Sequence, residues 1–91
     1  MSSKKPKRKI LLTPVAKEDL HFWELNNSKM IIKINSLLEA ILENPENGIG
    51  KPEKLKYELS GSWSRRISHK DRIVYQVEAD AIIVLQLRDH Y

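Results

Sequence analysis

The sequence predicts an α+β fold of order β-α-α-β-β-β-β, with two N-terminal helices packed on one face of a twisted antiparallel sheet. Apolar residues recur at helical spacing between residues 13 and 43, which indicates two helices. From residue 52 onwards apolar and polar residues alternate, which indicates strands. A short apolar run at residues 10–12 adds one strand before the helices. Helices grouped before strands are typical of an α+β fold.

The chain has 91 residues, a length that suits one domain. We expect residues 1–9 to form a flexible basic tail, because they contain five cations and no acidic residue, and residues 10–91 to form the domain. The absence of cysteine excludes disulfides, thiol catalysis and cysteine-ligated zinc. No apolar run is long enough for a membrane helix or a signal peptide, so we expect a cytoplasmic protein without membrane association.

Each predicted helix has recognisable ends. Thr13 can act as the N-cap of the first helix, and Pro14 suits its first position because the missing N–H group costs nothing there. This helix reaches Asn26 and has an apolar stripe of Ala16, Leu20 and Trp23. Residues 26–28 break it and cap a second helix, which ends at residues 44–45. The core-facing residues of the second helix are Met30, Ile34, Leu37 and Ile41.

The second half of the chain is predicted to contain four strands. A loop over residues 46–52, marked by two glycines and a proline, precedes them. The last strand is almost entirely apolar, which is typical of a central, buried strand. The expected strands span residues 55–59, 63–67, 72–77 and 81–87.

Charge is distributed unevenly along the sequence. Residues 51–72 contain seven basic and three acidic residues, whereas residues 10–50 contain three basic and six acidic ones. A positive segment on an otherwise acidic domain is typical of a face that binds a polyanion. An ordinary solvated polar surface is the alternative interpretation.

Several residues together match what RNA cleavage without a metal requires, namely a base, an acid and cations around the phosphate. Glu53 is a carboxylate in a basic loop, and His90 follows the last strand. Histidine suits the role of the acid because it titrates near neutral pH. Arginine remains charged and can bind phosphate through two N–H groups; the candidates are Arg65, Arg66 and Arg72. No histidine pair has metal-ligand spacing and no phosphate-binding glycine loop follows a strand, so we expect neither metal nor cofactor.

The sequence resembles the YoeB/Txe family of toxins in the RelE-like superfamily over about residues 10–91. The order and spacing of the matching segments make the resemblance specific. These segments are Gly50–Lys56, Leu59–Gly61, Trp63–Ile67, Asp71–Tyr75 and the terminal His90-Tyr91.

The resemblance implies a RelE-like fold and a toxin of a type II toxin–antitoxin system. Such a toxin would be a ribosome-dependent endoribonuclease that cleaves mRNA in the A site through attack by the 2′-OH, thereby inhibiting translation. It also implies a homodimer, contact with the bacterial ribosome and mRNA, and neutralisation by a cognate YefM/Axe-like antitoxin.

The resemblance further assigns roles to individual residues. Glu53 would be the general base, His90 the general acid and Arg72 the cation that stabilises the transition state. By position, Lys56, Arg66 and Tyr91 would bind phosphate and bases. From the basic segment we expect further phosphate contacts; these are Lys51, Lys54 and Arg65.

Two other functions fit the same fold prediction. A non-catalytic RelE-fold toxin could inhibit DNA gyrase by binding it, although such a protein would not need the terminal His90-Tyr91. An RNA-binding module could use only the basic face of residues 51–72, and its binding would depend strongly on salt.

Overall fold

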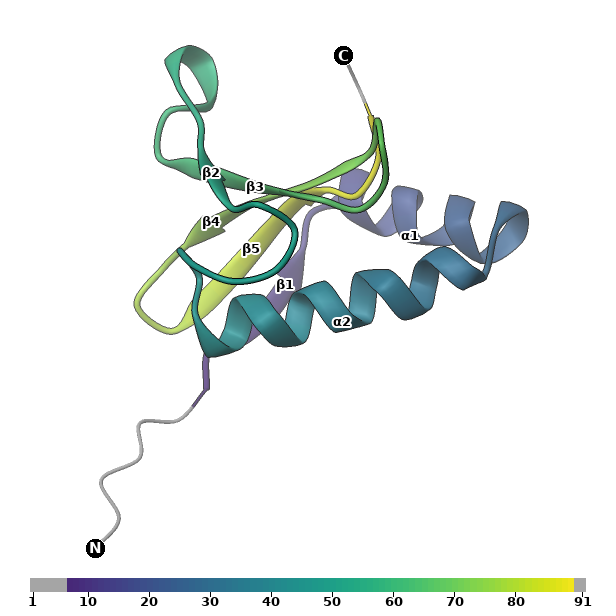
Figure 1. Ribbon diagram of the computed structural model, residues 1–91, viewed down its shortest axis with the longest axis horizontal. Helices are drawn as coiled ribbons and strands as arrows, with labels where there is room; N and C mark the ends of the chain where they lie inside the picture. The colour runs from purple at the N-terminus through teal and green to yellow at the C-terminus, as the bar shows by residue number, and fades with distance from the viewer. Residues whose placement is uncertain (1–6, 90–91) are drawn as a thin grey trace, which may run out of the picture.

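A computed structural model describes residues 7–89 and confirms the α+β fold and the predicted order of elements (Figure 1). Residues 1–6 of the predicted basic tail lie outside the described residues. Lys9, which was expected in the tail, belongs to the first strand. The elements are β1 (Lys9–Leu12), α1 (Pro14–Asn26), α2 (Lys29–Glu43), β2 (Glu53–Lys54), the 3-10 turn η1 (Tyr57–Leu59), β3 (Ser62–Arg66), β4 (Arg72–Val77) and β5 (Ala81–Gln86).

The five strands form one mixed sheet in the order β1-β5-β4-β3-β2. The three pairings among β2 to β5 are antiparallel, as predicted, but β1 runs parallel to β5. The expectation of a wholly antiparallel sheet is therefore wrong in one pairing. The two helices separate β1 from the later strands, and such a long connection permits a parallel pair that a tight turn would not. As predicted, β5 is an interior strand, lying between β1 and β4.

The predicted strand over residues 55–59 is wrong. The strand that pairs with β3 is shorter and lies earlier, at Glu53–Lys54. Beyond it the chain leaves the sheet through η1 and projects past the sheet edge (Figure 1). Tyr57 has a positive φ of 61° and is 89% exposed, which is incompatible with a regular strand. The alternation of apolar residues in this segment therefore reflects a turn rather than a half-buried strand.

The predicted start of α1 is confirmed, whereas α2 begins differently. Thr13 Oγ1 accepts from the Ala16 N–H at 3.2 Å and donates to the Leu85 carbonyl at 3.0 Å, so the cap also joins α1 to β5. Ser28 occupies the N-cap position of α2 but makes no side-chain capping bond. Core packing, rather than a cap, therefore stabilises the start of α2. Within residues 7–89, neither helix has the length and apolarity needed to cross a membrane.

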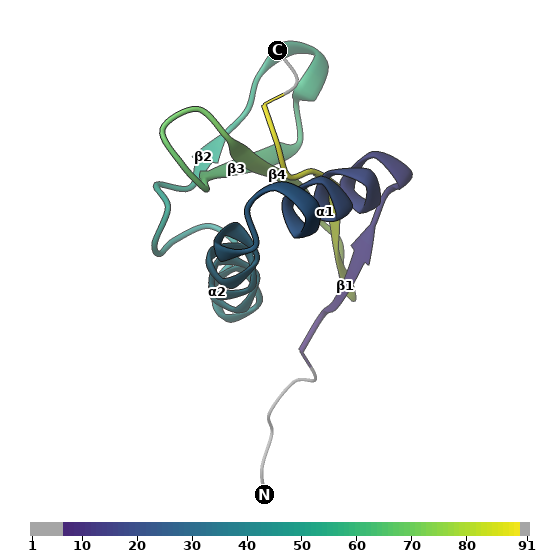
Figure 2. The same cartoon turned by 90° about the vertical axis from the view of Figure 1, so that its right-hand side faces the viewer.

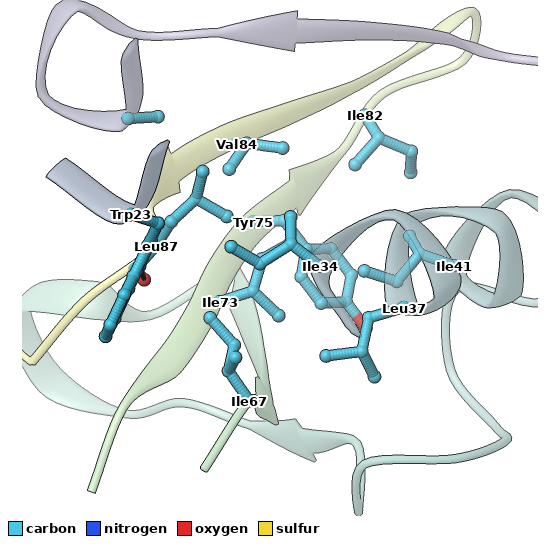
Figure 3. Packing of buried hydrophobic residues seen from close by; sticks show 11 residues of the cluster. Trp23, Ile34, Leu37, Ile41, Ile67, Ile73, Tyr75, Ile82, Val84 and Leu87 are labelled. Atoms are coloured by element: carbon cyan, nitrogen blue, oxygen red, sulfur yellow. Dashed lines mark hydrogen bonds between the residues drawn. The ribbon is translucent and has the colours of Figure 1, made fainter. Parts of the chain in front are cut away.

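The core lies between α2 and one face of the sheet (Figures 2 and 3). Ile34, Leu37 and Ile41 of α2 are buried, as their spacing predicts. Trp23 of α1 closes one end of this core and donates from Nε1 to the Leu87 carbonyl at 2.8 Å. The sheet contributes Ile67, Ile73, Tyr75, Ile82, Val84 and Leu87.

Strand register determines which polar residues lie on the face of the sheet away from the helices. Side chains of directly paired residues point to the same face. Arg65 pairs with Ile73, a core residue, and so lies on the helix-covered face. Ser64 is adjacent to Arg65 in β3, so its side chain points to the opposite face. Its pairing partners Val74 and Glu53 lie on that face too. This second face, which we call the open face, carries the site described next.

Candidate functional site

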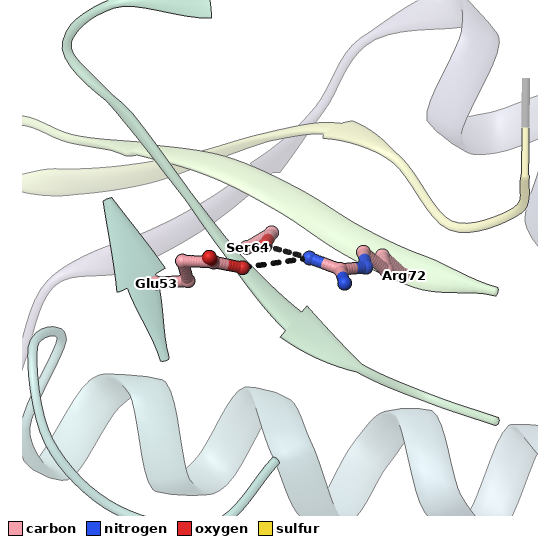
Figure 4. Close-up of polar contacts among 3 residues, drawn as sticks. All are labelled: Glu53, Ser64 and Arg72. Carbon is pink, nitrogen blue, oxygen red and sulfur yellow. Dashed lines mark hydrogen bonds and ion pairs between the residues drawn. The ribbon is translucent and has the colours of Figure 1, made fainter. Parts of the chain in front are cut away.

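Glu53, Ser64 and Arg72 meet on the open face, each from a different strand (Figure 4). Arg72 Nη1 donates to Glu53 Oε1 at 3.0 Å and to Ser64 Oγ at 3.1 Å. The register brings them together, because Glu53 pairs with Ser64 and Arg72 is the diagonal neighbour of Ser64 across β3 and β4. Two of the three predicted catalytic residues are thus in direct contact.

The pair is accessible from solvent. The side chain of Glu53 is 62% exposed and that of Arg72 is 28% exposed, while Ser64 is buried beneath them. An exposed ion pair of this kind contributes only about 0–1 kcal/mol to stability. Both described contacts of Arg72 use one guanidinium nitrogen, Nη1. The arrangement can therefore offer a carboxylate as proton acceptor and a guanidinium as anion ligand to one bound group.

Four of the predicted phosphate-binding residues are exposed in or beside β2 and β3, although Lys54 pairs with Trp63 and so lies on the face opposite to that of Glu53. Lys51 and Lys54 flank or belong to β2, Lys56 immediately precedes η1, and Arg66 ends β3. Lys51 and Arg66 also line a cavity of about 410 Å³ between α2 and the loop before β2. These cations are free to meet a polyanion, which fits the positive segment seen in the sequence.

Arg65 is an exception, and the expected phosphate contact of this residue is wrong. The residue is fully buried on the helix-covered face. Its guanidinium donates to the Tyr75 hydroxyl at 3.1 Å and to three loop carbonyls: Ile49 at 3.2 Å, Asn47 at 3.0 Å and Asn44. Because Asn44 is the C-cap residue of α2, Arg65 fixes the end of that helix and the loop that leads to Lys51.

The loop over residues 44–50 passes close to the Arg65 guanidinium. Gly48 has a φ of +128°, and a Cβ atom there would lie 3.1 Å from Arg65 Nη1. Gly50 has a φ of +83°, and a Cβ atom there would lie 2.8 Å from Leu37 Cδ2. Both positions therefore favour glycine through backbone conformation and through space. The two glycines that marked a loop in the sequence allow this close packing.

Tyr75 completes the buried network. Its hydroxyl donates to the Pro45 carbonyl at 2.6 Å and accepts from Arg65 Nε at 3.1 Å. Burial raises the pKa of Tyr75, and this effect exceeds the lowering by the hydrogen bond and positive charge of Arg65. The phenol is therefore held in its neutral, donating form.

We expect Tyr75→Phe to lower the free energy of unfolding at pH 7 by about 1–3 kcal/mol, because the Pro45 carbonyl and Arg65 Nε lose their buried partner. The folded state holds the phenol proton more tightly than the unfolded state. The stability contributed by this proton is complete below the unfolded pKa and is lost as pH rises through the higher folded value. Urea unfolding between neutral and alkaline pH should show a steeper alkaline decline for the wild type than for Tyr75→Phe. Parallel curves would contradict this role.

The predicted His90 and Tyr91 contributions lie outside the described residues. The last described residue, Asp89, donates its backbone N–H to Asp71 Oδ1 at 2.9 Å, next to Arg72 in the sequence. His21 and His69 are exposed, as expected. Among residues 7–89, no group of three histidine, aspartate or glutamate side chains could hold a metal ion.

Ser64 and Asp71 were not among the residues expected at the site, although both are buried polar residues beside it. Ser64 binds Arg72 directly, and Asp71 binds the C-terminal segment. A signal was present for Ser64, since it alternates with residues of the apolar face and so shares a face with Arg66. For Asp71 the sequence carried no comparable signal, because its partner lies 18 residues away.

Comparison with known proteins identifies what this chain is similar to. Residues 12–91 match the family model described as YoeB-like toxin of bacterial type II toxin-antitoxin system. Toxin YoeB of Synechocystis sp. is 41% identical over 83 residues, which cover 91% of this chain and 96% of that protein. The crystal structure of a heterotetrameric YoeB-YefM toxin-antitoxin complex from Staphylococcus aureus matches with a TM-score of 0.86 and 44% identity, covering 94% of this chain and 100% of that one. A YoeB dimer from the same organism matches over the same fractions with a TM-score of 0.87 and 44% identity.

Proposed function

Because this chain belongs to the YoeB family of toxins of type II toxin–antitoxin systems and has their RelE-like fold, we propose that it is a ribosome-dependent endoribonuclease. It cleaves mRNA in the ribosomal A site and thereby inhibits translation. The reaction proceeds by general acid–base catalysis without a metal.

In the proposed reaction the 2′-OH attacks the adjacent phosphorus and the bond to the 5′-oxygen breaks. Glu53 removes the 2′-OH proton as general base, and His90 protonates the departing 5′-oxygen as general acid. Arg72 stabilises the negative charge that develops on the non-bridging phosphate oxygens. The products are a 2′,3′-cyclic phosphate and a 5′-hydroxyl end, so no proton is gained or lost overall.

The contact between Glu53 and Arg72 is the observation that carries this proposal. The two groups lie 3.0 Å apart on the open face, where one phosphodiester can engage both. Their mutual contribution to stability is small, which leaves a functional reason for placing a carboxylate and a guanidinium together there. The exposed cations would hold the flanking phosphates; these are Lys51, Lys54, Lys56 and Arg66, and we add Tyr91 as a base contact.

We also propose partners by relationship. The Staphylococcus aureus relatives were solved as a YoeB-YefM complex and as a YoeB dimer. This chain would accordingly form a homodimer and be neutralised by a YefM/Axe-like antitoxin. A ribosomal substrate places its action in the bacterial cytoplasm.

Induced expression of the wild type in bacterial cells is expected to arrest growth and protein synthesis, whereas Glu53→Gln should not. The glutamine keeps the size of the side chain but cannot accept the 2′-OH proton, so cleavage should fall by about 100-fold or more. Growth and amino-acid incorporation after induction provide the measurement. Glu24→Gln is the matched control, because Glu24 is an exposed glutamate of α1 whose described ion pair is with His21. It should remain toxic.

Equal toxicity of Glu53→Gln and the wild type would contradict the proposal. A supercoiling assay with purified protein then separates the gyrase alternative, which predicts inhibition at stoichiometric amounts. If Glu53→Gln remains toxic and the affinity of the protein for RNA falls steeply as salt is raised, the RNA-binding module is favoured instead.

A further inference from the structure

The segment that follows β5, residues 87–89, is held by side chains from two other parts of the chain. Asp19 Oδ2 of α1 accepts from the Leu87 N–H at 2.8 Å. Trp23 Nε1, one turn further along α1, donates to the Leu87 carbonyl at 2.8 Å. Asp71 Oδ1 accepts from the Asp89 N–H at 2.9 Å. We call Asp19, Trp23 and Asp71 the C-terminal clamp.

The clamp is built to hold this segment firmly. Asp19, Trp23 and Asp71 are 2%, 8% and 6% exposed, so their hydrogen bonds are shielded from competing water. Asp19 and Asp71 accept through carboxylates, which form stronger hydrogen bonds with backbone N–H groups than neutral acceptors do. Arg88 adds a further contact, since its guanidinium carbon lies 3.5 Å from the centroid of the Phe22 ring.

Asp71 differs from the other two members because it also belongs to the turn that carries Arg72. Asp71 Oδ2 accepts from Ser68 Oγ at 3.0 Å, and the Asp71 backbone N–H donates to Ser68 Oγ at 3.1 Å. The carboxylate is therefore fixed within the β3–β4 turn before it binds Asp89. The Asp71 side chain thus connects the turn that precedes Arg72 to Asp89, the residue before His90.

We propose that Asp71 is a positioning residue for the acid step of the reaction. It fixes the backbone at Asp89, the residue before the proposed acid, to the turn that carries Arg72. This inference rests on the proposed ribonuclease function and on the assignment of His90 as the acid. Asp71 itself touches neither the substrate nor the reacting atoms.

The test uses two versions of one mRNA on programmed ribosomes in single-turnover reactions with the full chain. One version has the natural 5′-oxygen at the scissile linkage, and the other has a bridging sulfur there. A thiolate leaves without being protonated, so the sulfur linkage does not need a general acid. We expect Asp71→Ala to cleave the natural mRNA about tenfold or more slowly than the wild type, and the sulfur mRNA within about twofold of it. His90→Ala should show the same selective rescue.

Two further variants separate positioning from general damage. Asp71→Asn keeps an oxygen that can accept from the Asp89 N–H and should restore most of the rate. Ser68→Ala removes the two hydrogen bonds of the Ser68 hydroxyl but leaves the backbone bonds of the turn and the Asp71 carboxylate, and should stay within about threefold of the wild type. Independently of activity, the amide signal of Asp89 in ¹H–¹⁵N spectra should shift in Asp71→Ala and be retained in Ser68→Ala.

Each outcome distinguishes the two proposals. A wild-type rate in Asp71→Ala, a loss that persists on the sulfur mRNA, or an unchanged Asp89 amide signal would overturn the positioning role alone. Full activity of His90→Ala on the natural mRNA would overturn the acid assignment, and the positioning role with it. A wild type that cuts neither mRNA would overturn the proposed function itself.

Discussion

Arg72→Ala is expected to lower the rate of mRNA cleavage by about 100- to 1,000-fold, the range found when a donor that stabilises transition-state charge is removed. The guanidinium is the only strand-borne cation in direct contact with Glu53 among the described residues. In the proposed reaction its loss would remove the ligand for the developing phosphate charge and also the partner that orients Glu53. Single-turnover cleavage on programmed ribosomes gives the rate directly.

Two companion variants make this prediction specific. Arg72→Lys keeps a positive charge but cannot make two parallel hydrogen bonds to phosphate, so it should recover only part of the lost rate. Arg8→Ala is the matched control, because Arg8 is a partly exposed arginine bound to the Glu78 carbonyl, just beyond the far end of β4. The free energy of unfolding should fall by no more than about 1–3 kcal/mol in Arg72→Ala, because the ion pair with Glu53 contributes about 0–1 kcal/mol and the buried Ser64 hydroxyl loses its donor. A rate close to that of the wild type would remove Arg72 from the mechanism.

Arg65→Leu is expected to lower the free energy of unfolding by about 3–5 kcal/mol, a large part of the stability of a domain this size. The substitution leaves three loop carbonyls and the Tyr75 hydroxyl without their donor. Each buried polar group left unsatisfied costs about 1–3 kcal/mol, and water entering the partly exposed loop recovers some of this. Urea unfolding followed by circular dichroism provides the measurement.

The neighbouring arginine supplies the control for this experiment. Arg66→Leu alters an exposed side chain on the other face of β3 and should change the unfolding free energy by less than about 0.5 kcal/mol. If the two leucine variants were equally stable, the buried network around Arg65 would not stabilise the fold as we infer.

The helices and the last three strands could be predicted because their signals are local. Thr13 and Pro14 mark the start of α1 through capping chemistry, and the stripe of α2 follows from helical spacing. The parallel pairing of β1 could not be predicted, because apolar residues 10–12 indicate a strand without indicating its partner or direction. Residues 55–59 misled the prediction, since the positive φ of Tyr57 replaces the expected strand by a turn.

Arg65 and Arg66 illustrate what sequence reasoning can and cannot decide at the site. Both were expected at phosphate, yet adjacent strand residues point to opposite faces. The alternation already grouped Arg65 with apolar Ile67, and the structure buries both. What the sequence alone could not supply was the network of loop carbonyls that makes a buried arginine stable.

The contact between Glu53 and Arg72 depends on register rather than on local pattern. The two residues are 19 positions apart and meet only because β2 and β4 pair with opposite edges of β3. Residue types in the sequence indicated which chemistry was available. The order of strands in the sheet determined that the Glu53 carboxylate and the Arg72 guanidinium meet.

Mapping mRNA ends in a translating bacterial extract shows directly whether this chain cleaves mRNA on the ribosome. Wild-type protein is predicted to produce new 5′-hydroxyl ends within the codon occupying the A site, while His90→Ala and Glu53→Gln produce about 100-fold fewer. Translation that stops without new mRNA ends, or identical cleavage by the wild type and both variants, would contradict the account.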